Sequence, residues 1–184
     1  DRGDVHYVCI NNCFFHRGMS YYSPGELRER QVSWLKQNLA LTPKDKKVVL
    51  CYHIPFTFGN APFSKAKPLT NANEEGHYSS SRLSLLLSLL KPFKGGYELF
   101  CGHTHFACNH EINYEGEDVM EHCHAAACGN IWQSNINICG TPNGYYVYSF
   151  VGTSISNCYY KGTFWDKSKQ MTIFRAQTDF NGEK

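Results

Sequence analysis

Three histidines stand at the ends of two strand-like runs, and their type and spacing suit metal-dependent chemistry. His103 and His105 belong to a Gly-His-Thr-His box that follows the run at 97–101. His53 follows a second apolar run at 48–52. On extended backbone, side chains two residues apart point to one face, with their Cα atoms roughly 6–7 Å apart. That span suits two ligands of a metal pair whose ions lie about 3.5–4 Å apart.

The runs before these histidines form part of a predicted β-α-β-α-β order in the first half of the chain. Residues 5–10, 47–52 and 97–101 are rich in Val, Leu, Tyr and Cys, a composition that favours strands. The unbroken apolar run at 47–52 indicates burial on both faces, as in a parallel sheet covered by helices. In open α/β sheets, ligands bind at the carboxyl ends of the strands, where all three histidines stand.

Two helices separate these strands, and a β-rich second half follows them. Ser23 is the expected N-cap of the first helix, which has Pro24 and Glu26 in its first turn and runs to about Leu39. The second helix is expected at 81–90. The later strands are predicted at 119–127, 145–150, 155–160 and 171–174, with Pro142-Asn143-Gly144 as the strongest turn signal.

The composition predicts a globular domain and gives no support for several other classes. The chain has 184 residues, of which 42% are hydrophobic, so one domain can bury a core. A net charge of +2 with scattered basic residues does not favour a nucleic-acid partner. No stretch approaches the roughly 20 apolar residues that a membrane span needs. The nine cysteines are expected to be mostly reduced, because a domain of this size does not depend on disulfides.

The two histidine boxes, taken together, resemble the C-terminal half of the calcineurin-like metallophosphoesterases. The boxes are Tyr52-His53-Ile54-Pro55 and, about 50 residues later, Cys101-Gly102-His103-Thr104-His105. Further stretches resemble a bacterial branch of that superfamily, in which a small C-terminal domain follows the catalytic domain. They are Arg2-Gly3-Asp4-Val5-His6-Tyr7, Trp34-Leu35 with Lys46-Lys47-Val48-Val49, and Gly140-Thr141-Pro142-Asn143-Gly144-Tyr145.

The resemblance implies a fold, an activity and a set of ligands. The fold would be an α/β, four-layer α/β/β/α sandwich with two mixed sheets. Residues 1–165 would form the C-terminal part of the catalytic domain, and 166–184 the last strand and the start of a linker or C-terminal domain. The activity would be hydrolysis of phosphomono- or phosphodiesters by a water that two divalent metal ions (Mn, Fe, Zn or similar) activate. The implied ligands are His53 and His103 for the second ion and His105 for the first.

The long segment at 54–78 is expected to lie over this metal site. Loops of such length are more often functional than idle. Phe56, Asn71 and His77 in this segment are candidate substrate-binding residues, and simple packing of the loop is the alternative.

The other ligand boxes of the superfamily are missing from this sequence. The family has an Asp-X-His pair, a bridging Asp, and an Asn-His pair whose histidine acts on the leaving group. Asp4-Val5-His6 has the letters of the first box but precedes its strand, and Gly129-Asn130 lacks the histidine that should follow. We therefore expect a fragment that begins after those boxes, with no catalytic residue of its own and at most one weakly bound ion.

Such a fragment would be poorly active or inactive alone. Its expected partners are a phosphate-ester small molecule and the missing N-terminal half of the domain. Exposed sheet edges could also join two copies as a homodimer. The family implies a periplasmic or secreted protein, and a cytoplasmic location stays open.

Two non-catalytic interpretations also stay open. A structural or interaction domain would keep its histidines hydrogen-bonded and metal-free, so its stability would not depend on metal. A zinc-stabilised binding module would hold one zinc tightly and unfold in a chelator. Its candidate ligands are Cys101, His103, His105, Cys108, His110, His122, Cys123 and His124.

Overall fold

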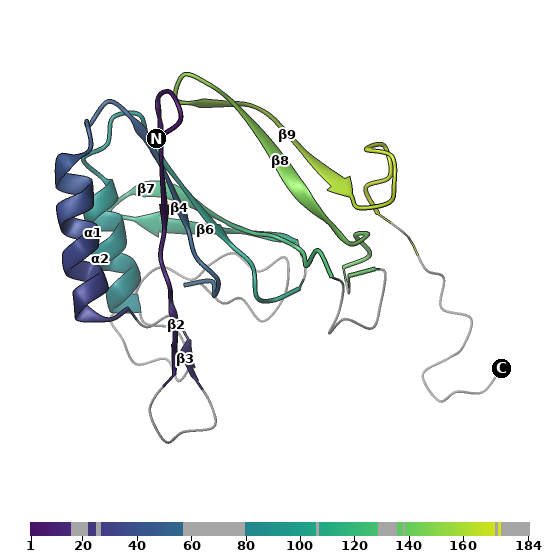
Figure 1. Ribbon diagram of the computed structural model, residues 1–184, viewed down its shortest axis with the longest axis horizontal. Coiled ribbons are helices and arrows are strands. Elements are labelled where there is room, and N and C mark those ends of the chain that lie inside the picture. Colours follow the sequence, from purple (N-terminus) through teal and green to yellow (C-terminus); the bar gives the residue numbers. More distant parts are fainter. Residues whose placement is uncertain are drawn as a thin grey trace.

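The chain has a mixed α/β fold, as its sequence predicts (Figure 1). The computed structural model describes residues 1–15, 22–24, 27–56, 80–105, 107–128, 136–137, 139–171 and 173. Within these ranges, none of the helices has the length and apolar character needed to cross a membrane.

The central element is a five-stranded sheet with the strand order β1-β4-β5-β7-β6. The strands β1 (Val5–Cys9), β4 (Lys47–Cys51), β5 (Tyr97–Cys101) and β7 (Glu117–Cys123) run parallel to one another. The edge strand β6 (Cys108–Tyr114) pairs with β7 in the antiparallel sense and was not predicted. The parallel order brings the carboxyl ends of β4 and β5 to the same edge of the sheet, as the histidine boxes require.

Two helices cover one face of this sheet, on the left in Figure 1. They are α1 (Glu29–Leu41) and α2 (Ser80–Leu90). In each helix the buried residues recur at spacings of three and four, which is the pattern of one apolar helical face. The buried side chains are Val32, Leu35 and Leu39 in α1, and Leu83, Leu86, Leu87 and Leu90 in α2.

The predicted start of the first helix at Ser23 is wrong. Tyr22–Pro24 forms the strand β3, which pairs with β2 (Cys13–Phe15), and α1 begins at Glu29. Its N-cap, Arg28, has extended backbone and makes no side-chain capping bond. Leu27 and Val32 flank the first turn in the same buried cluster, the arrangement of a hydrophobic staple. Burial of apolar side chains therefore fixes this helix end, and the local capping signal at Ser23 does not.

A second hairpin, β8 (Gly144–Val151) with β9 (Ser154–Gly162), lies on the opposite side of the sheet from the helices (Figure 1). Its turn places Gly152 at φ 59°, a backbone conformation that glycine adopts without strain. Tyr148 stacks on Phe100 of β5 with 4.6 Å between ring centroids. The described layers are thus helices, sheet and hairpin.

Two finer predictions about the fold have different outcomes. The strand expected at 171–174 is wrong where it can be checked, because Met171 and Ile173 have no strand structure. The four-layer sandwich needs a second helical layer, and the described part of the chain contains one such layer. That arrangement therefore stays a prediction.

Candidate metal centre

His53 and His103 meet at the carboxyl ends of two neighbouring parallel strands. Backbone pairing of β4 and β5 continues beyond both strands, because Gly102 N–H donates to the His53 carbonyl at 3.0 Å. The two rings are edge to face, with centroids 4.9 Å apart. His103 Nδ1 lies 3.1 Å from His53 Nε2. The sequence predicted that these two boxes meet, and the structure brings these two histidines into contact.

The separation of the two nitrogens fits the distance between two ligand atoms of one metal ion. Imidazole nitrogens bind zinc at about 2.0–2.1 Å, so two ligands at roughly 90–110° around an ion lie roughly 2.9–3.4 Å apart. The 3.1 Å between His103 Nδ1 and His53 Nε2 falls in that range. In the metal-free form the same distance allows a hydrogen bond, with one neutral ring as donor and the other as acceptor.

The backbone of the histidine turn, residues 102–105, is not extended as the spacing argument assumed. His103 and His105 have φ values of 69° and 62°. Thr104 N–H donates to the Gly102 carbonyl at 2.8 Å, which closes a γ-turn around His103. Left-handed backbone is strained for residues with a Cβ and is concentrated at functional sites. The imidazole directions are therefore set by a tight turn.

Glycine at position 102 has no steric role here. A Cβ built on Gly102 would meet its nearest neighbour, the His124 carbonyl oxygen, at an ordinary contact distance of 3.9 Å. Its φ is also not positive. The residues with constrained backbone are the histidines themselves.

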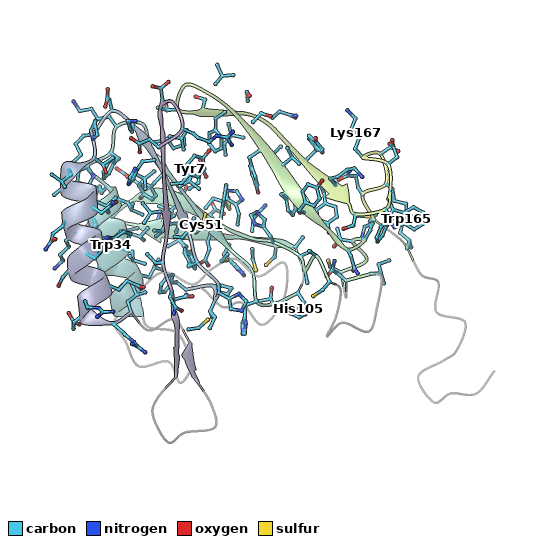
Figure 2. The ribbon with its side chains drawn as sticks, in the orientation of Figure 1. Tyr7, Trp34, Cys51, His105, Trp165 and Lys167 are labelled. Atoms are coloured by element: carbon cyan, nitrogen blue, oxygen red, sulfur yellow. The ribbon has the colours of Figure 1, made fainter. Side chains whose placement is uncertain are left out.

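His105 lies close to this pair but does not complete a three-ligand group. Figure 2 shows His105 below Cys51, the last residue of β4. Within the described ranges, no three or more His, Cys, Asp or Glu side chains are grouped so that they could hold a metal ion. The structure therefore forms a two-histidine pair with a third histidine beside it.

The surroundings of the pair favour neutral imidazole. Burial lowers the pKa of His103, and the charges of His53 and His105 lower it further. Neutral imidazole is the form that binds metal ions. At neutral pH the turn therefore presents a ring that needs to lose no proton before it binds.

A fully buried amide fixes the His53 side of the site, and sequence reasoning missed it. Asn12 Oδ1 accepts hydrogen bonds from the backbone N–H groups of His53, at 3.1 Å, and Ile54, at 3.0 Å. Its Nδ2 donates to the Ile54 carbonyl at 2.6 Å. The available signal was a polar residue just beyond the strand β1, at the same sheet edge as the histidines.

A buried carboxylate fixes the same loop a few residues later. Glu121 Oε1 accepts from the Tyr52 hydroxyl at 2.5 Å and from the Phe56 backbone N–H at 2.7 Å. Burial and the nearby Glu121 charge raise the pKa of Tyr52 well above its usual value, so its hydroxyl stays protonated. The signal for Glu121 was an acidic residue in phase with Val119 and Cys123 on the inward face of β7.

The candidate substrate contacts have separate outcomes. The Phe56 side chain is buried in the core and packs on Tyr52 with ring centroids 4.8 Å apart, so it does not face the metal site. Asn71 and His77 lie outside the described residues. The Asp4-Val5-His6 box lies at the amino end of β1, where His6 Nε2 is 2.8 Å from Asn38 Oδ1 of α1.

Three cysteines, Cys101, Cys108 and Cys123, lie next to the histidine turn on the helix-covered side of the sheet. Cys123 Sγ donates to the Gly102 carbonyl at 2.9 Å and lies 3.0 Å from Thr104 Oγ1. Burial raises the pKa of Cys101, so that thiol stays protonated.

The candidate ligands of a zinc module are divided between the two faces of the sheet. Cys101, Cys108 and Cys123 belong to the core under the helices. His122 and His124 face the hairpin, where both rings contact Tyr148. His122 bonds to Glu98 and Asn109, and His124 Nε2 lies 2.8 Å from the Tyr148 hydroxyl. A shared zinc site would need both sets on one side.

Comparison with known families gives a match for the C-terminal part of the chain. Residues 121–184 match the family model for the C terminal of Calcineurin-like phosphoesterase. The match begins within β7 and includes the β8–β9 hairpin. No curated protein and no solved structure matches the chain. The family match supports the calcineurin-like superfamily that the histidine boxes indicated, through the similarity of residues 121–184 to its C-terminal region.

Proposed function

We propose that this chain supplies the histidine ligands of a metal-dependent phosphoesterase. The observation that carries the proposal is the contact of His53 and His103, with their nitrogens 3.1 Å apart at the ends of adjacent parallel strands. Two imidazoles from separate loops converge at a geometry that suits one ion, and the family match independently points to phosphoesterases. No feature of the described residues favours the zinc-module alternative to the same degree.

In this proposal His53 and His103 bind one divalent ion, and His105 turns toward a second. When both ions are bound, they activate a water and neutralise charge on the phosphoryl oxygens of a phosphomono- or phosphodiester. The contribution of this chain is to bind and orient. Asn12 and Glu121 fix the His53 loop, and the γ-turn sets the direction of the His103 ring.

The finer parts of the proposal come from the resemblance. The remaining ligands and the leaving-group histidine would come from sequence outside this chain, and the complete domain would be a four-layer sandwich. The chain alone would then bind one ion weakly and show little or no turnover. A bacterial, periplasmic or secreted parent enzyme fits the same resemblance.

Metal binding by the 184-residue chain tests the role of the pair. We expect isothermal titration with Mn²⁺ or Zn²⁺ to give about one bound ion, and His53→Ala and His103→Ala each to weaken binding about tenfold or more, since each removes one of two ligands. His6→Ala is the matched control, because His6 lies at the other end of β1 and bonds to Asn38. Equal affinity in all four proteins would contradict the proposal.

Turnover by the full-length protein tests the reaction itself. With manganese present, we expect it to hydrolyse a chromogenic phosphodiester, and His103→Ala and His105→Ala to lose most of that activity. Unchanged turnover in the His105→Ala protein would remove His105 from the proposed site. No hydrolysis of mono- or diesters by the intact protein would refute the phosphoesterase assignment.

A further inference from the structure

The three cysteines behind the histidine turn form a thiol cluster, defined here as Cys101, Cys108 and Cys123. They come from the adjacent strands β5, β6 and β7, and the pairing register places Cys123 directly beside each of the other two. All three are free and buried.

Cys123 also connects this cluster to the histidine turn. Its Sγ lies 2.9 Å from the Gly102 carbonyl oxygen and 3.0 Å from Thr104 Oγ1, the residues on either side of His103. The thiol therefore bonds to both ends of the γ-turn that directs the His103 ring. Any chemistry that moves Cys123 Sγ must remove these bonds.

We propose that Cys108 and Cys123 form a reversible disulfide on exposure to a peroxide, and that this bond releases the histidine turn. Directly opposed residues of antiparallel strands have Cα atoms about 4.5–5.5 Å apart, within the range that a disulfide spans. Cys108 is preferred over Cys101 because His110 Nε2 lies 3.3 Å from Cys108 Sγ and can accept its proton. Cys101 Sγ is instead directed at the His122 carbonyl.

The reaction balances with hydrogen peroxide as the oxidant. Cys123 sulfur attacks the peroxide, an S–O bond forms, the O–O bond breaks, and one water leaves. Cys108 sulfur then attacks the oxidised sulfur while His110 takes its proton and passes it to the departing oxygen as a second water. Two thiols and one peroxide give one disulfide and two waters.

The consequence for the proposed metal site, on which this part rests, is a loss of preorganisation. In the disulfide, Cys123 sulfur has no proton to donate to the Gly102 carbonyl and is drawn toward β6. The γ-turn around His103 then keeps its Thr104–Gly102 bond but loses the bonds to the thiol. We expect a metal affinity about tenfold weaker in the oxidised chain. This is the lower end of the roughly 10- to 100-fold loss seen when a group that orients a metal ligand is removed.

Peptide mapping of the complete 184-residue chain tests the disulfide. The chain is treated with hydrogen peroxide, blocked with an alkylating reagent and cleaved after glutamates. Glu111, Glu115, Glu117 and Glu121 separate the peptide with Cys101 and Cys108 from the peptide at 122–183, which contains Cys123, Cys128, Cys139 and Cys158. Loss of the link in Cys123→Ser then assigns it to Cys123. We expect these peptides to be joined before reduction with dithiothreitol and separate after it. Peroxide-treated wild-type chain without this link would overturn the proposal.

Single serine variants identify the partner of Cys123. The link should persist in Cys101→Ser and disappear in Cys108→Ser, while Cys158→Ser on the exposed face of β9 is the matched control and should leave it unchanged. A link that survives Cys108→Ser and is lost in Cys101→Ser would overturn the pairing. Circular dichroism confirms that each variant folds, and the wild-type map decides the question if one does not.

Amide NMR of the metal-free chain tests the coupling to the turn. We expect the Thr104 and His103 signals to shift on oxidation, to return with dithiothreitol, and to stay unchanged in peroxide-treated Cys108→Ser. A disulfide without any shift of Thr104 would overturn the coupling. Because this readout needs no metal, it decides the inference even if the chain binds no metal in either redox state, a result that would count against the proposed function instead.

Discussion

The two loops that carry the histidine pair are fixed in different ways. The His53 loop is bonded by the amide of Asn12 and, further along, by the carboxylate of Glu121, both fully buried. The side-chain anchor of the histidine turn at 102–105 is the thiol of Cys123, beside the backbone bonds of the γ-turn and of Gly102 to the His53 carbonyl. Histidines thus stand at equivalent strand ends in both loops, but strong hydrogen bonds to buried side chains hold one loop and weaker thiol bonds hold the other.

The difference follows from the chemistry of the anchoring groups. An amide has two donors and an accepting oxygen in one plane, so Asn12 satisfies three backbone groups of His53 and Ile54 at once. A thiol is a weak donor and a weak acceptor. The histidine turn also contains left-handed backbone at His103 and His105, which resists relaxation only while its neighbours constrain it. We infer that the His53 loop is rigid and that the histidine turn is the adjustable half.

The largest expected effect comes from Asn12→Ala. This change leaves three buried backbone groups without partners, and each such group costs about 1–3 kcal/mol. We expect the free energy of unfolding in urea to fall by about 3 kcal/mol or more. Asn11→Ala is the matched control, because the exposed Asn11 amide oxygen accepts only from Cys13 N–H at 2.9 Å. A similar loss in both variants would mean that the His53 loop has no special anchor.

The second-largest expected effect is a loss of stability in acid that arises beside the histidine turn. Burial lowers the pKa of the His124 imidazole to about 4. The backbone N–H of the same residue donates to the Cys101 carbonyl, just before the histidine turn. Because the unfolded chain has a pKa near 6.5 there, it binds more protons between about pH 6.5 and 4, so stability is full above that window and falls within it. The loss should be on the order of 2 kcal/mol.

Denaturant titrations from pH 7 to pH 4 measure this effect. The variant His124→Gln keeps a polar side chain but cannot titrate, so its stability should fall less over the same range. His103, whose pKa is lowered in the same direction, adds to the wild-type slope. A profile in which the variant and the wild type fall in parallel would show that His124 does not control the turn side.

Replacement of Cys123 by alanine should have a smaller effect. It removes the bonds to Gly102 and Thr104, and hydrogen bonds of this kind contribute about 1 kcal/mol each or less. We expect unfolding to be about 1 kcal/mol easier, with faster hydrogen exchange at Thr104. Cys123→Ser restores a donor and should recover part of the protection. Exchange as slow in the alanine variant as in the wild type would mean that the thiol does not stabilise the turn.

The smallest expected effect comes from Gly102→Ala. The added methyl group finds its nearest neighbour at 3.9 Å, and the backbone is not left-handed there. Alanine also restricts the unfolded chain, so we expect a change of a few tenths of a kcal/mol in either direction. Thermal unfolding beside the wild type measures it. A loss of stability above about 1 kcal/mol would show that glycine is needed there for close backbone approach.

Local sequence patterns predicted those elements that a local property determines. The apolar runs before His53 and His103 became β4 and β5, and the leucine spacing of 81–90 became α2. Their adjacency followed from the β-α-β order, since parallel strands joined by helices are neighbours in one sheet. That rule is why the His53–His103 contact could be predicted without coordinates.

Other features depend on distant parts of the chain and could not be derived this way. Ser23 has all the letters of a helix start, yet its segment pairs with β2, and tertiary pairing overrides local capping preference. The left-handed backbone at His103 depends on bonds to Cys123, twenty residues later. No periodicity in the sequence reports such contacts.

By itself, the sequence determined which histidines form the candidate site and the sheet edge at which they gather, because strand propensity and chain order are encoded locally. The tertiary structure alone decided how each histidine is oriented. Asn12, just beyond β1, bonds to the His53 backbone, and Cys123 of β7 bonds to the histidine turn. Such hydrogen bonds depend on distance in space and not on separation along the chain.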